Sequence, residues 1–416
     1  MTTPAANSAR NPHAPLGQRE FIVLIAALMS LQALGVDAML PALPAIGKSL
    51  HVVGENTTQW IIASYVFGLG AMQLVYGPLA DRYGRRPVLL VTMAGFVLAS
   101  IIASVSATFP LLIAARVLQG AMLASSRVLT TSIVRDCYSG RTMARIMSLA
   151  QMLFFVVPVL APTVGSAILL FGPWRWIFWF FVVFATVVAG WAAVRLPETL
   201  KPEARRDISF ALLRSAWFQT VSNRFSLGYS LASTAMFGAI LGYVNSSQQL
   251  FADVFKRPDI FPLAFAITAG AMGVMTFANA QLVERFGTRR LSHTALLVLI
   301  AISAFHLAVE LSGYQTLTNY LVLQAMTMAC FGLTGSNFSA MAMEPVGHIA
   351  GTASSVQGFL STVGGAIIGI IIGQSFDGTT MPVTIGFLIV AATALIIVLI
   401  TEGGQLFTAR NAPVKF

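Results

Sequence analysis

The chain has 416 residues, of which 56% are hydrophobic and only 10% are charged, and its formal net charge at pH 7 is +10. So few charged groups could not keep the surface of a soluble protein hydrated, which excludes that class. The two cysteines, Cys137 and Cys330, imply no disulfide framework. The positive charge alone would suit nucleic-acid binding, but the basic residues lie beside long apolar segments, where membrane topology explains them. We therefore expect a membrane protein that does not bind nucleic acid.

Twelve apolar segments are long enough to cross a hydrocarbon core of roughly 30 Å, which takes about 20 helical residues. No convincing small-residue cleavage site follows the first segment, so we expect it to be retained and not removed as a signal peptide. The predicted fold class is an all-α integral membrane protein. Its spans lie near residues 20–43, 57–80, 88–107, 110–133, 143–170, 174–196, 225–246, 259–283, 291–311, 316–340, 349–374 and 381–402.

The basic residues of the connecting loops predict the orientation. An even number of spans places both termini on the same side of the membrane, and most arginines lie in loops on that side. By the positive-inside rule, both termini are therefore cytoplasmic. The loops on the opposite side hold only four basic residues: Lys48, Arg175, Lys256 and Arg257.

Two charged residues in the first and fourth spans lie at matched depth. Asp37, the only carboxylate well inside a predicted span, lies six residues (43 − 37), about 9 Å of helix, before Leu43. Arg116 lies six residues (116 − 110) after Pro110 on a helix of opposite direction. Charged residues inside a span are usually functional. Arg127 is near enough to the cytoplasmic end for its guanidinium to reach the headgroups, and we favour this over a role in a cavity.

A buried acid and base at one depth allow two interpretations. Burial favours the neutral form of a carboxyl group and a nearby arginine favours its charged form, so a group between these effects can change protonation with its surroundings. The alternative is a static ion pair that holds the helices together. We favour proton coupling through Asp37 and Arg116, with Arg116 either exchanging protons itself or orienting the site.

An internal repeat relates the two halves of the chain. The loop after the second span reads Gly77-Pro-Leu-Ala-Asp81-Arg82-Tyr83-Gly84-Arg85-Arg86, and the loop after the eighth reads Ala280-Gln-Leu-Val-Glu284-Arg285-Phe286-Gly287-Thr288-Arg289. Both have an acid, an arginine, an aromatic residue and a glycine in this order, offset by 203 residues (284 − 81 and 287 − 84). Transporters with such repeats commonly bind substrate between the halves, near mid-membrane.

The repeat predicts the domain organisation. Residues 20–196 and 225–402 are expected to form two pseudo-symmetric six-helix bundles, joined by a cytoplasmic linker, residues 197–224. Residues 1–19 are expected to be a flexible cytoplasmic N-terminus, and residues 403–416 a cytoplasmic tail.

The fifth span combines prolines with small residues. Pro158 and Pro162 each remove a backbone donor and favour a bend. Ala161 and Gly165 allow a neighbouring helix to approach closely. Together they favour a specific bent interface.

These segments resemble motifs of the major facilitator superfamily. The stretch from Gly77 to Arg86 resembles its motif A, Arg116-Val-Leu-Gln119-Gly120 resembles motif B, and Ala161-Pro162-Thr-Val-Gly165-Ser166 resembles motif C, the antiporter signature, with Ala and Ser in place of its first and last glycines. Further segments resemble Bcr/CflA-type twelve-span drug:proton antiporters: Asp37 with Leu40-Pro41-Ala42-Leu43-Pro44, Trp174-Arg175 with Phe178, and Leu196-Pro197-Glu198-Thr199.

The resemblance implies a function and roles for residues. It implies a monomer in the bacterial inner membrane that exports small amphipathic compounds in exchange for protons. It makes the first and fourth spans neighbours, so that Asp37 and Arg116 face each other, and it assigns motif C a role in limiting leak. It also implies a cytoplasmic gate, although the arginines alone would fit a simple topology signal. The gate residues are Gly77, Asp81, Arg82, Gly84, Arg85 and Asp136.

A cavity for amphipathic substrates needs broad apolar contact and a few polar anchors, and methionines and aromatic side chains adapt to varied shapes. Amides and tyrosines within spans are stronger candidates than apolar residues, because exposing them to lipid would be costly. The candidates are Met29, Gln32, Tyr65, Gln119, Met152 and Phe155 in the first half, and Tyr229, Phe237, Tyr243, Asn245, Asn319, Gln324 and Phe331 in the second.

Two other functions compete with drug export. A proton-coupled importer or a narrow-substrate metabolite transporter would share motif A and Asp37 but would not usually carry motif C. An enzyme is disfavoured because no metal-ligand cluster, phosphate-binding loop or nucleophile with a base stands out. We expect no cofactor and no metal, and as partners a small-molecule substrate, protons and membrane lipids.

Overall fold

The computed structural model describes residues 16–54, 56–205 and 210–407, and these residues form helices and no strand. The first half contains α1 (Gln18–Asp37), α2 (Leu43–Ser49), α3 (Trp60–Tyr83), α4 (Arg85–Ser104), α5 (Phe109–Cys137), α6 (Gly140–Phe171) and α7 (Arg175–Arg195). The linker holds α8 (Phe210–Ser222). The second half contains α9 (Arg224–Gln249), α10 (Phe261–Phe286), α11 (Thr288–Leu311), α12 (Leu317–Met343), α13 (Ala350–Gln374) and α14 (Met381–Glu402). Short turns are η1 (Leu40–Ala42), η2 (Thr57–Gln59), η3 (Pro202–Ala204), η4 (Leu250–Val254), η5 (Pro258–Ile260) and η6 (Glu344–Ile349).

The lengths and composition of these helices suit a membrane. Ten helical segments of the described chain are long and apolar enough to cross one. The helix α6 adds the shorter apolar stretch Val156–Phe171, and α12 adds a further helix of 27 residues. Inside hydrocarbon every backbone polar group must be bonded within the protein, which a helix achieves within its own segment. The prediction of an all-α integral membrane protein is confirmed.

The first predicted span is not one continuous helix. The helix α1 ends at Asp37, and the chain continues through η1 into the short helix α2. Pro41 and Pro44 lie in the first turns of η1 and α2, where their missing N–H groups cannot continue the hydrogen bonds of α1. Asp37 is therefore the last residue of a helix, which corrects the depth estimate that assumed unbroken helix to Leu43.

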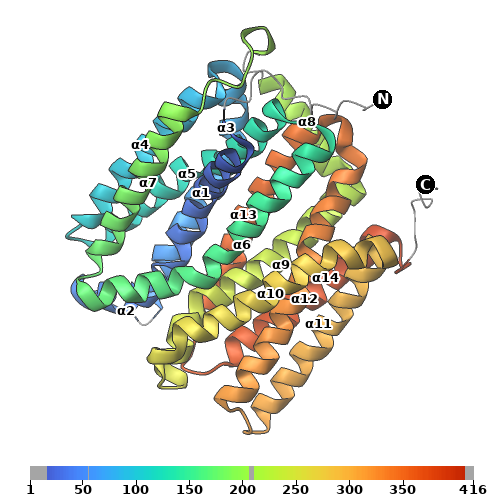
Figure 1. Ribbon diagram of the computed structural model, residues 1–416. Helices are drawn as coiled ribbons and strands as arrows, with labels where there is room; N and C mark the ends of the chain where they lie inside the picture. The colour runs from blue at the N-terminus through green and yellow to red at the C-terminus, as the bar shows by residue number, and fades with distance from the viewer. Residues whose placement is uncertain (1–15, 55, 206–209, 408–416) are drawn as a thin grey trace, which may run out of the picture.

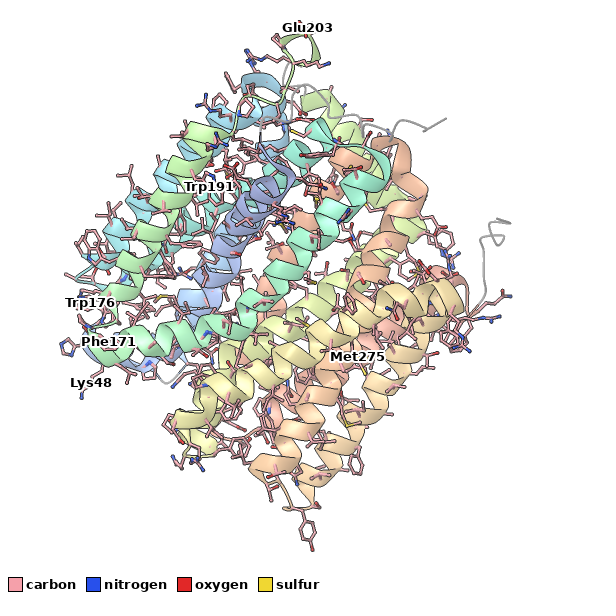
Figure 2. All side chains as sticks on the ribbon, in the orientation of Figure 1. Lys48, Phe171, Trp176, Trp191, Glu203 and Met275 are labelled. Carbon is pink, nitrogen blue, oxygen red and sulfur yellow. The ribbon has the colours of Figure 1, made fainter. Side chains whose placement is uncertain are left out.

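The two halves lie side by side, the first at the upper left of Figure 1 and the second at the lower right. Contacts between the halves come mainly from α3 against α13 and from α6 against α10. Lys48, Phe171 and Trp176 lie at one end of the molecule and Glu203 at the other (Figure 2). We call these the α2 end and the motif A end, because the latter carries the loop between α3 and α4.

Four side-chain amides join the halves at the α2 end, and we call Asn56, Gln59, Gln249 and Gln374 the amide cluster. Gln59 Nε2 donates to Gln249 Oε1 at 2.6 Å, and Gln249 Nε2 donates to Asn56 Oδ1 at 3.0 Å. Asn56 Nδ2 donates to the backbone oxygen of Gln374 at 3.0 Å, and Gln374 Nε2 donates back to the backbone oxygen of Asn56 at 2.8 Å. The amide cluster therefore fastens the two halves together at this end.

Halfway along the interface, Gln73 of α3 donates to the hydroxyl of Thr362 of α13 at 3.1 Å. Both residues are buried. The hydrogen bonds between the halves that involve described residues lie here or at the α2 end. Hydrogen bonds thus join the halves from the middle of the interface to the α2 end.

Candidate functional site

Arg116 of α5 is completely buried and forms three hydrogen bonds. Its Nη2 donates to the backbone oxygen of Gly35 at 2.6 Å, its Nε to that of Ile61 at 3.0 Å, and its Nη1 to Gln119 Oε1 at 2.9 Å. The last carbonyls of a helix have no partner within the helix, and Gly35 is two residues before the end of α1. Arg116 therefore caps the broken end of α1.

Asp37 lies beside this cap. Its side chain is 6% exposed, and with the described residues it forms no hydrogen bond or ion pair. Tyr65 of α3 interacts electrostatically with both Asp37 and Arg116, whose guanidinium lies 4.3 Å from the centre of the Tyr65 ring. The structure thus gathers Asp37 and Arg116 around Tyr65 without pairing them, and it does not contain the static ion pair.

The motif B residues next to Arg116 hold the helices together. Gln119 is fully buried, and besides accepting from Arg116 its Nε2 donates to Ser100 Oγ of α4 at 2.7 Å. A Cβ at Gly120 would overlap the backbone oxygen of Tyr65, so only glycine fits this crossing of α3 and α5. Gln119 was expected in the substrate cavity but lies between α4 and α5, inside the first half.

Motif C of α6 packs directly on the broken end of α1. A Cβ at Gly165 would overlap the backbone oxygen of Ala38 and lie 2.9 Å from the Pro41 ring. Ala161 and Pro162 are buried and Pro158 is half-buried. The glycine therefore permits α6 to touch the residue that follows Asp37.

Arg127 lies eleven residues (127 − 116) after Arg116 on α5, three helical turns toward the motif A end and on nearly the same face. Its side chain is exposed, and it forms no ion pair with the described carboxylates.

The predicted gate residues form a charged cluster at the motif A end. Arg85 contacts Asp81 at 2.6 Å and Asp136 at 3.1 Å, and Thr199 donates to Asp136 at 3.3 Å. Arg85 is buried, whereas 43% of the Asp81 side chain is exposed. Arg82 is also exposed, and its guanidinium lies over the neighbouring tyrosine ring. The cluster therefore joins residues of the first half to Thr199 of the linker.

Glu198 belongs to this cluster and was not among the predicted site residues. Its carboxylate accepts from the backbone N–H groups of Arg85 at 2.9 Å and Arg86 at 3.3 Å, at the first turn of α4. Gly84 has a φ of +104°, and a Cβ there would overlap the same carboxylate. Negative charge is stabilising at a helix N-terminus. The sequence indicated this residue only through the family resemblance of the segment Leu196-Pro197-Glu198-Thr199.

The second half holds a related cluster that sequence reasoning missed. Arg289, at the start of α11, contacts Glu402 of α14 at 2.9 Å and Glu344 of η6 at 3.2 Å. The offset of 203 relates Arg289 to Arg86 (289 − 86). Tyr229 of α9 donates to Glu402 at 2.6 Å and lies 3.3 Å from His293 Nε2. Tyr229 was expected in the cavity, but it is fully buried in this cluster because its hydroxyl pairs with the charges there.

Other expected cavity residues of the second half lie within that half. Asn319 forms a capping box with Thr316 at the start of α12. The hydroxyl groups of Tyr243 and Thr268 of α10 share a hydrogen bond of 3.1 Å. The ring centres of Phe331 and Phe387 of α14 lie 5.7 Å apart. Gln324 is fully buried. Three of these side chains thus have partners within the second half, and Gln324 is buried. The spacing of residues in the sequence does not reveal such contacts.

The remaining candidates lie on α1, α6 and α9 and differ in burial. Met29 is buried and Gln32 half-buried on α1, where the Gln32 backbone oxygen accepts from Tyr65 Oη at 3.1 Å. On α9, Phe237 is half-buried and Asn245 is buried, and both lie against glycines of α13. Met152 on α6 is 51% exposed, and the side chain of Phe155 lies outside the described part of the structure.

Comparison with known proteins identifies the family of this chain. The model of the Major Facilitator Superfamily matches residues 25–370. The Multidrug resistance protein MdtL of Escherichia coli is 30% identical over 83% of this chain and 86% of its own length. A Bicyclomycin resistance protein homolog of Haemophilus influenzae is 28% identical over 87% of this chain and 91% of its own. The crystal structure of a D-xylose-proton symporter, 14% identical, covers 93% of this chain and 99% of its own with a TM-score of 0.73, which supports the fold alone. The resemblance found in the motifs is confirmed, and the chain belongs to the Major Facilitator Superfamily, a family of multi-pass membrane transporters and not of enzymes.

Proposed function

We propose that this protein exports small amphipathic compounds, drugs or toxic metabolites, in exchange for protons. The observation that carries the proposal is the placement of Asp37. It is a buried carboxylate without an ion pair among the described residues, at a helix break that Arg116 caps and Gly165 contacts. An intramembrane carboxylate with this freedom can accept and release a proton. The names of the multidrug and bicyclomycin resistance relatives support drug export.

In this proposal, Arg116 positions the helices around Asp37. Its three donors are already occupied by Gly35, Ile61 and Gln119, so it holds α1, α3 and α5 in register around Asp37. A small displacement of α1 would change the surroundings of the Asp37 carboxyl group, which would couple proton binding to movement of the helices.

Transport then proceeds by alternating access. The bundles formed by residues 20–196 and 225–402 rock about the linker, residues 197–224. The motif A end, with both termini, faces the cytoplasm of a bacterial cell, and the amide cluster closes the outer side. Substrate enters from the cytoplasm between the halves, where Gln32, Phe237 and Asn245 supply contacts, and the protein works as a monomer.

The charged cluster around Arg85 acts as the cytoplasmic gate. Asp81 is tied to Arg85 yet remains partly exposed, and a Cβ at Gly77, one turn away, would lie 3.9 Å from Ser355 of α13. When the motif A end closes, Asp81 docks on the first turn of α13, where a helix N-terminus favours negative charge. Motif C keeps α6 pressed on α1 and limits proton leak.

The proposal is tested by transport of ethidium, a lipophilic cation, into inverted membrane vesicles under an imposed pH gradient. Wild type should accumulate ethidium, and collapse of the gradient should abolish accumulation. Asp37→Asn should insert normally and lose it, because an amide cannot carry the proton. Asp253→Asn is the matched control, since Asp253 is exposed in η4. Gradient-driven transport by Asp37→Asn at the wild-type rate would remove Asp37 from the mechanism. Movement of substrate with the protons would favour the alternative, a proton-coupled importer or narrow-substrate metabolite transporter.

A further inference from the structure

Arg127 of α5 has an exposed side chain although it lies level with the middle of the first helix. Ser126, the residue before it, donates to the backbone oxygen of Leu28 at 2.5 Å. Leu28 is ten residues (28 − 18) from the start of α1 and nine residues (37 − 28) from its end. The helix α5 continues for ten residues (137 − 127), about 15 Å, beyond Arg127. The sequence predicted an end of this span near residue 133, so Arg127 lies further from the helix end than expected.

The side of α5 that carries Arg127 faces the second half. Thr131 and Arg135 follow at intervals of four residues, which places them on the same side of the helix, and all three residues are exposed. A Cβ at Gly351, in the first turn of α13, would lie 3.9 Å from Arg135 Nη1, so this side reaches α13. The exposed apolar residue Leu118 lies nine residues (127 − 118), about 2.5 helical turns, before Arg127 and therefore on the opposite side. Arg127 thus points into the interface between the halves, which favours a cavity role over contact with lipid headgroups.

The guanidinium of Arg127 has no anionic partner among the described residues, with which it forms neither a hydrogen bond nor an ion pair. The described ion pairs at the motif A end use three other arginines, Arg85, Arg195 and Arg289. A charged residue within a span usually pairs with an opposite charge or marks a substrate pathway. Arg127 is therefore free to bind an anion that enters the interface.

The chemistry of this position suits an oxyanion. A guanidinium presents its N–H donors as a planar fork that matches a carboxylate with two parallel hydrogen bonds. Arg135, two turns nearer the motif A end, adds a second positive charge to the same side of α5. An interface lined by one sign of charge raises the local concentration of the opposite ions. Anions are thus attracted from the motif A end toward Arg127.

From these placements we propose that Arg127 binds the acidic group of small amphipathic anions, carboxylates or sulfonates, in the interface between the halves. The proposal extends the substrates of the exporter to compounds that join an apolar body to an acidic group. Export of the bound anion rests on the function proposed above, whereas its binding does not. The headgroup of an anionic phospholipid offers the same chemistry, and the experiments separate the two sources.

Binding is tested with the fluorescent carboxylate dansylglycine and its neutral amide, dansylglycinamide, on the purified chain in a non-ionic detergent. Wild type should bind the carboxylate at least tenfold more tightly than the amide. Arg127→Gln should lose this preference and bind the amide as wild type does. Arg290→Gln, which removes an exposed charge at the start of α11, is the matched control and should keep the preference. Equal affinities of wild type for the two probes, or an unchanged preference in Arg127→Gln, would overturn the proposal.

A second measurement leaves Arg127 in place and so does not depend on the folding of its variant. In a chain carrying Cys137→Ser and Cys330→Ala, the exposed position Thr131→Cys should react with N-ethylmaleimide. Saturating dansylglycine should slow this reaction at least tenfold, because the bound anion covers the neighbouring turn of α5, and dansylglycinamide at the same concentration should not. A reaction that dansylglycine leaves unchanged would place the anion elsewhere and contradict the proposal.

Mixed micelles separate a small-molecule anion from a lipid headgroup. Added phosphatidylglycerol should leave the affinity for dansylglycine within about twofold of its value in phosphatidylcholine. Displacement of the probe by phosphatidylglycerol alone would assign Arg127 to a lipid headgroup and overturn the small-molecule site.

Transport in inverted vesicles separates this site from the proposed function. Gradient-driven ethidium transport without Arg127-dependent binding of dansylglycine would refute the anion site and leave the function intact. Arg127-dependent binding without gradient-driven transport of either compound would support the anion site and refute the function.

Discussion

The guanidinium of Arg116 donates a 2.6 Å hydrogen bond to the backbone oxygen of Gly35, two residues before Asp37. The bond satisfies a carbonyl that the end of α1 leaves without a helical partner. It ties Arg116 to the helix end that carries Asp37 without pairing the two charges. Gly35 also packs closely on α3, because a Cβ at Gly35 would lie 2.5 Å from Tyr65 Oη. The broken end of α1 is thus held by side chains from α3 and α5, which makes the surroundings of Asp37 sensitive to how these helices pack.

Replacing Arg116 with lysine should impair transport although charge is retained. An ammonium group cannot reproduce the planar fork that reaches Gly35, Ile61 and Gln119 together. We expect at least a tenfold loss of gradient-driven ethidium transport and a loss of about 1–3 kcal/mol of stability from unpaired acceptors. Transport rates and thermal unfolding in detergent measure the two effects. Arg145→Lys, on an exposed residue of α6, is the control, and unimpaired transport by Arg116→Lys would show that charge alone suffices.

Gly165→Ala should separate α6 from the broken end of α1. The added methyl group would overlap the backbone oxygen of Ala38, so one of the two helices must shift. We expect a lower unfolding temperature and a proton leak or loss of coupling, measured with a pH-sensitive dye in proteoliposomes. Gly190→Ala has open space around it and should gain up to about 1 kcal/mol of helix stability. Similar behaviour of both variants would contradict a packing role for Gly165.

Removing the charge of Glu198 should weaken the start of α4. Glu198→Gln keeps the size of the side chain but replaces one acceptor oxygen with a donor that faces the N–H groups of Arg85 and Arg86. We expect a loss of about 1–2 kcal/mol, seen as a lower unfolding temperature. Glu203→Gln, in the exposed linker turn, should have no effect. An unchanged unfolding temperature in Glu198→Gln would mean that the cap contributes nothing.

Weakening the amide cluster should shift the protein toward opening at the α2 end. Gln59→Leu removes the hydrogen bonds to Gln249 and to the backbone oxygen of Gly373. Each is worth about 1 kcal/mol, so we expect roughly a tenfold or larger change in the ratio of closed to open molecules. Distances between probes at positions 48 and 256 report the shift. Gln281→Leu, at an exposed position of α10, is the control. Unchanged distances in Gln59→Leu would show that apolar packing closes this end.

The fold followed from the sequence because its signals are local. A run of about 20 apolar residues must form a helix in hydrocarbon whatever surrounds it, and the repeat around Asp81 and Glu284 relates the halves. The broken end of α1 was also readable in Pro41 and Pro44, but the long apolar run around them suggested an unbroken span.

The site was only partly predictable. Asp37, Arg116 and Gly165 stand out because charge or missing side chains inside a span are unusual, and the structure gathers them around one helix end. Glu198 and Glu402 did not stand out, because carboxylates at helix ends are common. Their partners, Arg85 and Arg289, are remote in sequence.

The amino-acid sequence by itself determined that this protein spans a membrane, that it has two related halves, and which charges lie within them. Tertiary structure decided what each charge and each amide touches. Tyr229 proved to bind Glu402, Gln119 to bridge Arg116 and Ser100, and Gln324 to be completely buried. The physical reason is that helix formation depends on neighbours along the chain, whereas the partner of a side chain depends on which distant helix packs against its face.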